Sequence, residues 1–544
     1  MTRPGPGPTT ADTDDSPATS RATRRRQQSS RRWYSAAAWL IGALIAFAVY
    51  LRLASTRAVN SDGSTSSLQA WDMLHGNVLL HGWTLGDASF YLTELPEYML
   101  VELVRGLSQD VVHVAAALTY TLTLLCAALL AKGQATGREA AARVGIAAGI
   151  MVAPQLNWGT DLFLSSPDHL GTSVPVLLAW LVLDRARPRW YVPLITSLLL
   201  AWAEVGDMLV LIIGVAPLVI VCGARVLRAV AVDKQPLAAQ RYDIALAAGA
   251  VLAAVTGVLA LVVIHDLGGF YAVVPGTQLA PVSTIVTHNA RVTGEGLLMI
   301  AGAWSPGGWT ALGALHLAGV VLAAWAVGVT AWRFARDEDM VAQLLLAGIV
   351  LSVGVFLVSV RGESILYTHD MAPVLPLAAA LTGRQLGGRL LAVRLAPALA
   401  SVLGLVLCGY LAGLAWELSH PPVPAQNQQL TSWLQAHGLR AGLSGYWGSS
   451  VVTVTSGGQV SVRPVQAEGG RIRPKLTLVN AAWYDPGQSS ADFVVLFPGI
   501  PVYPGLTDRA AVLATFGKPA QTYHVGQYTI LVWHKNLLAS LPGR

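Results

Sequence analysis

The chain has 544 residues, of which 53% are hydrophobic and 12% are charged, and its mean hydropathy is +0.52. A soluble globular chain is usually about one quarter charged, and a single core could not bury this much apolar surface, so a water-soluble protein is excluded. The net charge is +6, but the basic residues stand in short loops between apolar runs, which excludes a nucleic-acid-binding face.

The N-terminal segment, residues 1–34, is rich in Pro, Thr, Ser and Arg and has almost no large apolar side chains. This composition predicts a disordered cytoplasmic tail. Five arginines precede the first apolar run, Ala36 to Tyr50: Arg24, Arg25, Arg26, Arg31 and Arg32. The arrangement is similar to a signal peptide, but no small-residue cleavage pattern follows closely, so we expect an uncleaved first membrane helix.

Ten further apolar runs follow, at residues 110–131, 144–156, 172–183, 190–205, 207–223, 244–264, 309–332, 340–360, 365–383 and 395–415. With the first helix they predict an all-α polytopic membrane domain of about 11 spanning helices over residues 35–416. Two runs nearly touch, so a tight outer turn must join them around Glu204–Asp207. The cysteines Cys126, Cys222 and Cys408 lie inside apolar runs and read as small buried side chains.

The loop charges predict the orientation of the chain. Five basic residues fall on the outer side of the membrane part: Arg52, Arg57, Arg105, Arg291 and Arg361. Fifteen fall on the inner side: Lys132, Arg138, Arg143, Arg185, Arg187, Arg189, Arg225, Arg228, Lys234, Arg241, Arg333, Arg336, Arg384, Arg389 and Arg394. Because cytoplasmic loops carry the excess of Lys and Arg, the N-terminus is expected inside and the C-terminus outside.

Residues 417–544 have the pattern of a small extracytoplasmic α/β domain. Prolines mark a linker at its start: Pro421, Pro422 and Pro424. Helical spacing covers Asn427–His437. Four β-type runs follow, at Val451–Thr455, Gln459–Val462, Phe493–Phe497 and Tyr528–Trp533.

The long first outer loop, residues 55–110, is acidic: it holds Asp62, Asp72, Asp87, Glu94, Glu97, Glu102 and Asp110. Two amphipathic stretches, Ser66–Gly76 and Leu92–Leu107, are expected to be helices in the interface plane. Most such carboxylates are ordinary solvated charges. Asp62 differs because it follows the first helix in a polar run at the membrane surface, where it could take a proton from an acceptor hydroxyl.

Two later outer clusters leave alternatives open. In Ser165–Thr172, Ser166 or Asp168 could cap the next helix, or Asp168 and His169 could face a cavity, bind a sugar hydroxyl and help to hold a metal. Glu204 and Asp207 flank the tight turn. Ionisable groups at that depth are usually functional, although headgroups and water could also accommodate them.

A carrier phosphate would need a cationic partner on the outer side. Arg361 and Arg291 are the candidates there, because Arg can bind phosphate oxygens with two hydrogen bonds. Either residue could equally be an ordinary loop arginine.

Three segments of the first loop carry a family resemblance: Asp62-Gly63-Ser64-Thr65, the stretch Trp71 to Asn77, and Glu94-Leu95-Pro96-Glu97-Tyr98. They resemble the first outer loop of the GT-C superfamily of membrane glycosyltransferases, in particular its protein O-mannosyltransferase and aminoarabinose transferase branch. Arg361 followed by Tyr367 to Pro376 is similar to the family's Arg-Tyr…Pro…Pro signature. The sequence departs from the pattern at Gly63, where a second acidic residue is usual, and at Glu94-Leu95.

The resemblance implies a GT-C-like membrane domain and a glycosyltransferase that moves a sugar from a polyprenyl-phosphate carrier to a cell-envelope acceptor on the outer face of a cell membrane. The abundance of Ala, Gly, Arg and Trp favours a bacterial source. The resemblance implies Asp62 as the catalytic base, and a divalent metal is a candidate cofactor. The implied substrate-binding residues are Asp87, Glu94, Glu97, Asp168, His169, Asp207, Arg361 and His369.

Two other functions stay open. A non-catalytic GT-C-like scaffold could bind envelope glycan or a partner, and its C-terminal domain offers Tyr446, Trp447, Trp483 and Tyr484 for stacking on sugars. A transporter of lipid-linked substrates is less favoured, because few charges stand in the middle of the apolar runs. The sugar, the carrier, the acceptor and the oligomeric state do not follow from the sequence.

Overall fold

The computed structural model describes residues 17–152, 158–166, 169–273, 278–336, 338–392, 396–425, 427–499 and 504–542. Its contacts divide the chain into two compact units, Met1–Ala48 and Val49–Arg544. Helix α1 (Pro17–Ala54) begins in the first unit and ends in the second. The expected disorder is therefore wrong for residues 17–34. That stretch contains six arginines, and Arg is a good helix former.

Seven of the described helices are long and apolar enough to cross a bilayer: Trp33–Ala54, Gln109–Lys132, Leu211–Ala231, Leu237–Asp266, Ala311–Arg333, Met340–Val358 and Pro397–Ser419. They correspond to the apolar part of α1, α4 (Gln109–Lys132), α9 (Ala216–Ala231) with the π-turn before it, α10 (Arg241–Asp266), α13 (Ala311–Arg333), α14 (Met340–Val358) and α16 (Ala396–Ser419). The chain is a membrane protein, but the predicted count of about 11 spanning helices is not confirmed.

The remaining predicted runs also contain helices: α5 (Gly137–Met151), α7 (Ser173–Arg185), α8 (Tyr191–Gly206) and α15 (Val374–Ala392). The run at 365–383 begins instead with a 3₁₀ turn, Ile365–Met371, and its helix starts only after Pro373. Proline cannot donate a backbone hydrogen bond and is favoured at helix starts. The polar residues before it are thereby left in a turn.

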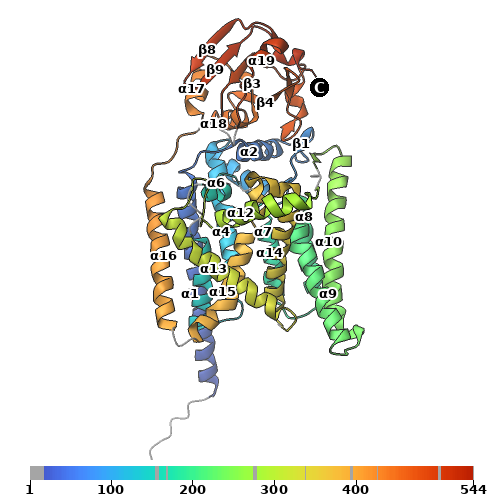
Figure 1. Ribbon diagram of the computed structural model, residues 1–544, viewed down its shortest axis with the longest axis vertical. Coiled ribbons are helices and arrows are strands. Elements are labelled where there is room, and N and C mark those ends of the chain that lie inside the picture. The colour runs from blue at the N-terminus through green and yellow to red at the C-terminus, as the bar shows by residue number, and fades with distance from the viewer. Residues whose placement is uncertain are drawn as a thin grey trace, which may run out of the picture. The chain divides into compact units, whose positions relative to one another are not determined.

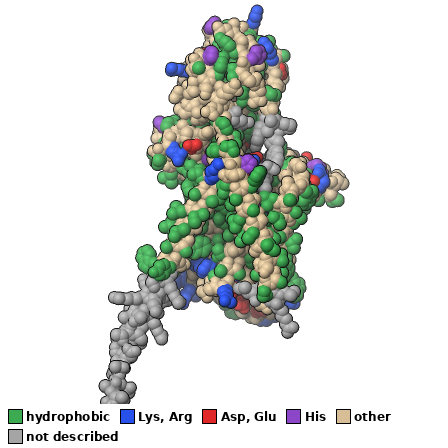
Figure 2. Space-filling view, turned by 90° about the vertical axis from the view of Figure 1, so that its left-hand side faces the viewer, with side chains coloured by type: hydrophobic (Ala, Val, Ile, Leu, Met, Phe, Trp, Pro, Cys, Tyr) green, Lys and Arg blue, Asp and Glu red, His purple; other side chains and the backbone are tan. Residues whose placement is uncertain are grey.

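The helical part has an inner and an outer set of helices (Figure 1). Helix α15 packs against α4, α5 and α14, and most of α4 and α14 is buried. Few residues of helices α10, α13 and α16 are buried, as in helices that face lipid. Figure 2 shows the resulting band of hydrophobic side chains, with charged side chains gathered at its margins.

The first outer loop folds into two short helices, α2 (Ser61–Leu74) and α3 (Leu95–Arg105), which confirms both amphipathic predictions as helices. The side chain of Asn60 accepts a hydrogen bond from the Gly63 backbone N–H and so caps α2. Pro96 lies in the first turn of α3. The tight turn after α8 is also confirmed, since α8 ends at Gly206 and the next turn starts at Leu211.

The C-terminal region contains a six-stranded sheet in the order β5-β4-β3-β7-β9-β8. Its strands are β3 (Ala441–Ser444), β4 (Ser461–Glu468), β5 (Arg471–Pro474), β7 (Phe493–Leu496), β8 (Gln521–Val525) and β9 (Tyr528–Val532). The central strands β4, β3 and β7 run parallel, and the outer pairs are antiparallel. Helices α17 (Gln428–Ala436) and α19 (Arg509–Phe516) complete the predicted α/β domain.

One predicted strand of this domain is wrong, because Val451–Thr455 lies in helix α18 (Ser450–Thr455). The β-branched residues favour a strand, but α18 packs against α2 of the membrane part, where the Thr65 hydroxyl donates to the Ser450 hydroxyl at 2.9 Å. The valines of α18 are buried. Burial against α2 therefore outweighs the local preference for a strand.

A second sheet of three short strands joins distant parts of the chain. Strand β1 (Trp83–Leu85) of the first loop pairs in parallel with β2 (Tyr271–Ala272), which follows α10. It pairs antiparallel with β6 (Val479–Asn480) of the C-terminal domain. The segment that follows β1, which carries Asp87, is therefore fixed by elements from three regions of the sequence.

Candidate functional site

Arg361 is the centre of a group of charged side chains beside the end of α14. It lies in the 3₁₀ turn Val360–Glu363. Its Nη1 donates to both carboxylate oxygens of Asp370 at 3.1 Å, and its Nη2 donates to Asp87. The guanidinium carbon lies 5.1 Å from the centroid of the Tyr367 ring. One guanidinium thus joins two carboxylates that are far apart in the sequence.

His169 and Asp207 form the second part of this group. His169 Nδ1 donates to Asp207 Oδ2 at 2.8 Å, and the Thr172 hydroxyl donates to the same oxygen at 2.5 Å. The backbone N–H of Leu209 donates to the other oxygen at 2.9 Å. Burial alone would lower the pKa of His169, but the carboxylates of Asp207, Asp370 and Asp87 raise that pKa well above its ordinary value. The surrounding carboxylates therefore favour the protonated form of the His169 ring.

Asp87 closes the group from the first loop. It follows β1, and the adjacent Ala88 pairs with Asp207 in an antiparallel bridge. Burial would raise the pKa of the Asp87 carboxyl, but His169 and Arg361 lower it below its ordinary value. The Asp87 carboxylate is therefore ionised at neutral pH.

His169, His369 and Asp370 could together hold a metal ion. Their ligand atoms all lie within 4.8 Å of one another, and the two imidazole rings stack with centroids 5.4 Å apart. Two imidazole nitrogens and a carboxylate oxygen are a donor set that suits Zn²⁺ and similar divalent ions. Asp207 supplies the outer carboxylate that usually orients a metal-binding histidine, so the residues fit a divalent metal. Metal binding would release the His169 proton.

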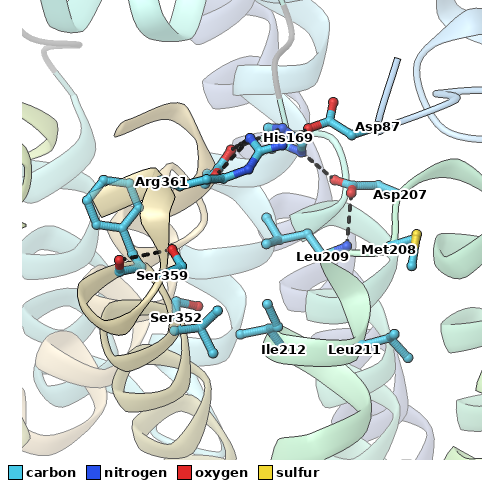
Figure 3. A pocket seen from close by; sticks show the side chains of 13 residues that line it. Asp87, His169, Asp207, Met208, Leu209, Leu211, Ile212, Ser352, Ser359 and Arg361 are labelled. Atoms are coloured by element: carbon cyan, nitrogen blue, oxygen red, sulfur yellow. Dashed lines mark hydrogen bonds and ion pairs between the residues drawn. The ribbon is translucent and has the colours of Figure 1, made fainter. Parts of the chain in front are cut away.

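A cavity of about 190 Å³ lies next to these side chains. Its polar end is formed by Asp87, His169, Asp207, Arg361 and Asp370. Its other wall is apolar and comes from the turn Met208–Ile212 and from α14, through Val355 and Phe356. Figure 3 shows the charged side chains at one level and the apolar side chains below them. The cavity therefore has one charged end and one apolar end.

Glu94 and Glu97 are not among the described residues that line this cavity. Glu94 is buried against Gly171, where a Cβ would come within 2.1 Å of Glu94 Oε1. Burial raises the pKa of Glu94 well above its ordinary value, and Glu97 and Asp207 add to this. Glu97 accepts a hydrogen bond from Thr119 at 2.6 Å, and burial raises its pKa to about 7. Direct substrate contact by these two acids stays a prediction.

Asp62 is placed at the C-terminal domain and is not among the described residues that line this cavity. Its Oδ1 accepts a hydrogen bond from the Tyr446 hydroxyl at 2.5 Å. The next residue is Gly63, and a Cβ there would lie 2.5 Å from Val112. No second acidic side chain could fit at that position without a shift, which gives the departure from the family pattern a steric reason.

The other predicted positions have mixed outcomes. Asp168 lies outside the described residues. Ser166 does not cap α7, whose N-cap residue is Thr172. Of the outer arginines, Arg361 lines the cavity, whereas Arg291 pairs with Glu295 within its own helix α12 (Ala290–Ile300).

Asp370 was missed by sequence reasoning. It directly follows His369 within the quoted Tyr367 to Pro376 stretch, and a run of two ionisable residues beside a family signature was the available signal. Two of the four aromatic residues proposed for sugar stacking have other contacts: Tyr484 is buried, and Trp483 packs edge-on against Trp83 of the first outer loop at 4.9 Å.

No protein-family model matches the sequence, and no curated protein matches it either. Among solved structures, ArnT from Cupriavidus metallidurans bound to undecaprenyl phosphate is similar over 94% of this chain and 99% of its own, with a TM-score of 0.56 and 14% sequence identity. The chain has a GT-C fold.

A second similar solved structure is the archaeal oligosaccharyltransferase AglB from Archaeoglobus fulgidus, in complex with an inhibitory peptide and a dolichol-phosphate. It matches over 85% of this chain and 70% of its own, with a TM-score of 0.46 and 12% identity. The fold agrees with the GT-C-like membrane domain that the sequence resemblance implied. In this chain the polar group at Arg361 and His169 lies where the first loop of the fold meets the end of α14.

Proposed function

We propose that the protein is a membrane glycosyltransferase that takes a sugar from a polyprenyl-phosphate carrier and passes it to an envelope acceptor. The observation that carries the proposal is the cavity at Arg361, which has a charged end and an apolar wall. A lipid phosphate has the same two parts. The solved ArnT structure, which shares the fold, contains undecaprenyl phosphate.

Arg361 is the proposed phosphate-binding residue. Among the described lining residues of this cavity it is the one with a guanidinium, and its fork can bind two phosphate oxygens. In the metal-free site, the protonated His169 ring, which the neighbouring carboxylates favour, provides a second hydrogen-bond donor beside it. To bind phosphate, the guanidinium must exchange part of its contact with Asp87 and Asp370.

The release of Asp87 by Arg361 would change the basicity of the Asp87 carboxylate. While Arg361 holds Asp87, the carboxylate has a low affinity for protons. When Arg361 turns to the carrier phosphate, Asp87 loses part of that stabilising charge and becomes a stronger base. Asp87 is therefore the proposed general base of this site, and Asp62 is the second candidate, from the family resemblance.

In the proposed reaction the acceptor oxygen forms a bond to C1 of the sugar as the bond between C1 and the phosphate oxygen breaks. The bonding pair leaves with the phosphate, which remains on the carrier. The acceptor's hydroxyl proton passes to the carboxylate of the base. A divalent metal held by His169, His369 and Asp370 would supply positive charge next to the departing phosphate.

The proposed location is the outer side of a cell membrane, with the N-terminus in the cytoplasm. The support is the charge bias of the loops. Basic residues gather at one end of the helical part. There Arg384 pairs with Asp184 at 2.8 Å and with Asp339 at 2.6 Å. The site lies instead with the first loop and the C-terminal domain.

The test is donor consumption by the full chain in nanodiscs. Radiolabelled decaprenyl-phosphate sugars would be supplied with an envelope extract as the acceptor source, and released decaprenyl phosphate would be measured. Asp87→Asn is expected to lower the rate by about 100-fold or more, as expected for loss of a general base. Asp110→Asn is the matched control from the same loop, because Asp110 is exposed and pairs only weakly with Arg105.

Each outcome distinguishes the candidates. An unchanged rate in Asp87→Asn together with a collapse in Asp62→Asn would transfer the base to Asp62. Binding of decaprenyl phosphate without any donor consumption by the wild type would favour the scaffold instead.

A further inference from the structure

A second cavity, of about 390 Å³, lies beside the first. It is enclosed by the end of α8, the last turns of α10 and strand β2. Asp87, Asp207 and Met208 line both cavities. The two cavities therefore meet at the carboxylate that the proposed reaction uses.

Glu204 is the unusual residue of the second cavity. Its side chain is 1% exposed, and neither carboxylate oxygen has a hydrogen-bond partner among the described residues. The helix opposite makes room for it at Gly257, where a Cβ would lie 2.2 Å from Glu204 Cγ. A buried carboxyl without a partner is costly and rare, so it calls for a ligand as its explanation.

The two cavities differ in charge. No described residue that lines the second cavity is Lys or Arg, and three are acids: Asp87, Glu204 and Asp207. A phosphate would be repelled there, whereas hydroxyl donors would find acceptor oxygens. The carrier phosphate therefore fits the cavity at Arg361, and a hydroxylated group fits the cavity at Glu204.

The second cavity opens on the outer surface of α10. Val258 and Val262 are 46% and 49% exposed, and Tyr271 is 50% exposed. Leu261 and Phe270 add to its apolar wall. Because most of α10 presents exposed apolar side chains, a ligand that enters here would come from the lipid phase.

We propose that this cavity is the acceptor site, that its ligand is an amphiphile with an apolar body and a hydroxylated head, and that Glu204 forms a hydrogen bond with a head hydroxyl. The role of this ligand as an acceptor rests on the proposed glycosyl transfer, whereas the binding of the amphiphile to this cavity does not. In this arrangement a neighbouring hydroxyl of the head lies at Asp87, opposite the carrier phosphate.

The test uses a decyl β-D-glucoside with a diazirine on its alkyl chain, at a concentration below micelle formation, and the full chain in nanodiscs. Labelling of the α10 peptides is measured by mass spectrometry. Glu204→Leu is expected to reduce the labelling by about tenfold, the loss that follows from one missing hydrogen bond in a buried site. Glu204→Gln, which keeps an acceptor oxygen, should label within about threefold of the wild type.

Glu102→Gln is the matched control, because Glu102 is another buried acid, on α3, that lines neither cavity. It should label as the wild type does. Excess decaprenyl phosphate should leave the labelling unchanged. A diazirine-bearing decane without the glucose head should label wild type and Glu204→Leu equally, which also shows that the variant is folded.

Equal glucoside labelling of wild type and Glu204→Leu would overturn the proposal. Displacement of the glucoside by decaprenyl phosphate would also overturn it, by assigning the cavity to the carrier. If the wild type does not bind decaprenyl phosphate at all, the proposed function fails, while labelling that depends on Glu204 would still stand.

Discussion

Replacement of Arg361 by Gln removes the guanidinium from the charged end of the first cavity. A hydrogen bond to a charged group contributes about 1.5–3 kcal/mol, and a guanidinium can offer two to one phosphate. Two costs reduce this gain: Arg361 must first release part of its contact with Asp87 and Asp370, and its side chain is 26% exposed. We expect a net loss of about 2 kcal/mol, or roughly 30-fold in Kd for decaprenyl phosphate.

The assay is a titration of the full chain in nanodiscs with decaprenyl phosphate, followed by native mass spectrometry. Arg361→Lys keeps the charge without the fork and is expected to lose about tenfold. Arg291→Gln is the matched control, since Arg291 is 61% exposed and pairs with Glu295. Decaprenol, which lacks the phosphate, should bind wild type and Arg361→Gln alike. Equal phosphate affinity in these two proteins, or an equal loss for decaprenol, would refute the assignment.

Three further predictions concern stability and metal binding. Burial raises the pKa of Glu102 to about 8, above its unfolded value, so its contribution to stability is complete at low pH and is lost as the pH rises through 8. The melting temperature of the wild type should therefore fall between about pH 5 and 8, and Glu102→Gln should flatten this fall. Parallel curves of melting temperature against pH for the two proteins would contradict this. Asp207→Asn should weaken Zn²⁺ binding by about 10–100-fold, and His169→Ala should abolish it, as measured by calorimetry. Equal Zn²⁺ affinities in the wild type and both variants would exclude this metal site. Tyr446→Phe removes a hydrogen bond to Asp62, so the free energy of local opening in α2 should fall by about 1 kcal/mol and its amide hydrogens should exchange faster. Unchanged exchange would show that this contact does not help to hold the C-terminal domain against α2.

The membrane helices were largely predictable because lipid imposes a simple rule on composition. Every apolar run contains a helix, and the linker, α17, β7 and β9 follow from local signals. Local preference was misleading where tertiary packing decides the structure. The β-branched run Val451–Thr455 became a helix because α2 lies against it, and the start of α15 depends on Pro373.

The site was predictable only in its parts. Asp87, His169, Asp207, Arg361 and His369 were all named from loop position, charge and family resemblance. That these five side chains come together in one site could not be derived from the sequence, because their contacts join distant residues. Asp87 and Arg361, for example, are 274 residues apart. The lack of a hydrogen-bond partner for Glu204 among the described residues is likewise a property of its surroundings, which no local pattern records.

The three-stranded sheet described above has a consequence for the order in which the protein matures. Strand β1 is synthesised well before its partner β6, which lies about 400 residues later in the chain. The sheet beside Asp87 therefore stays incomplete until β6 has emerged. A chain cut short before residue 479 would lack one of the two strands that pair with β1 beside Asp87.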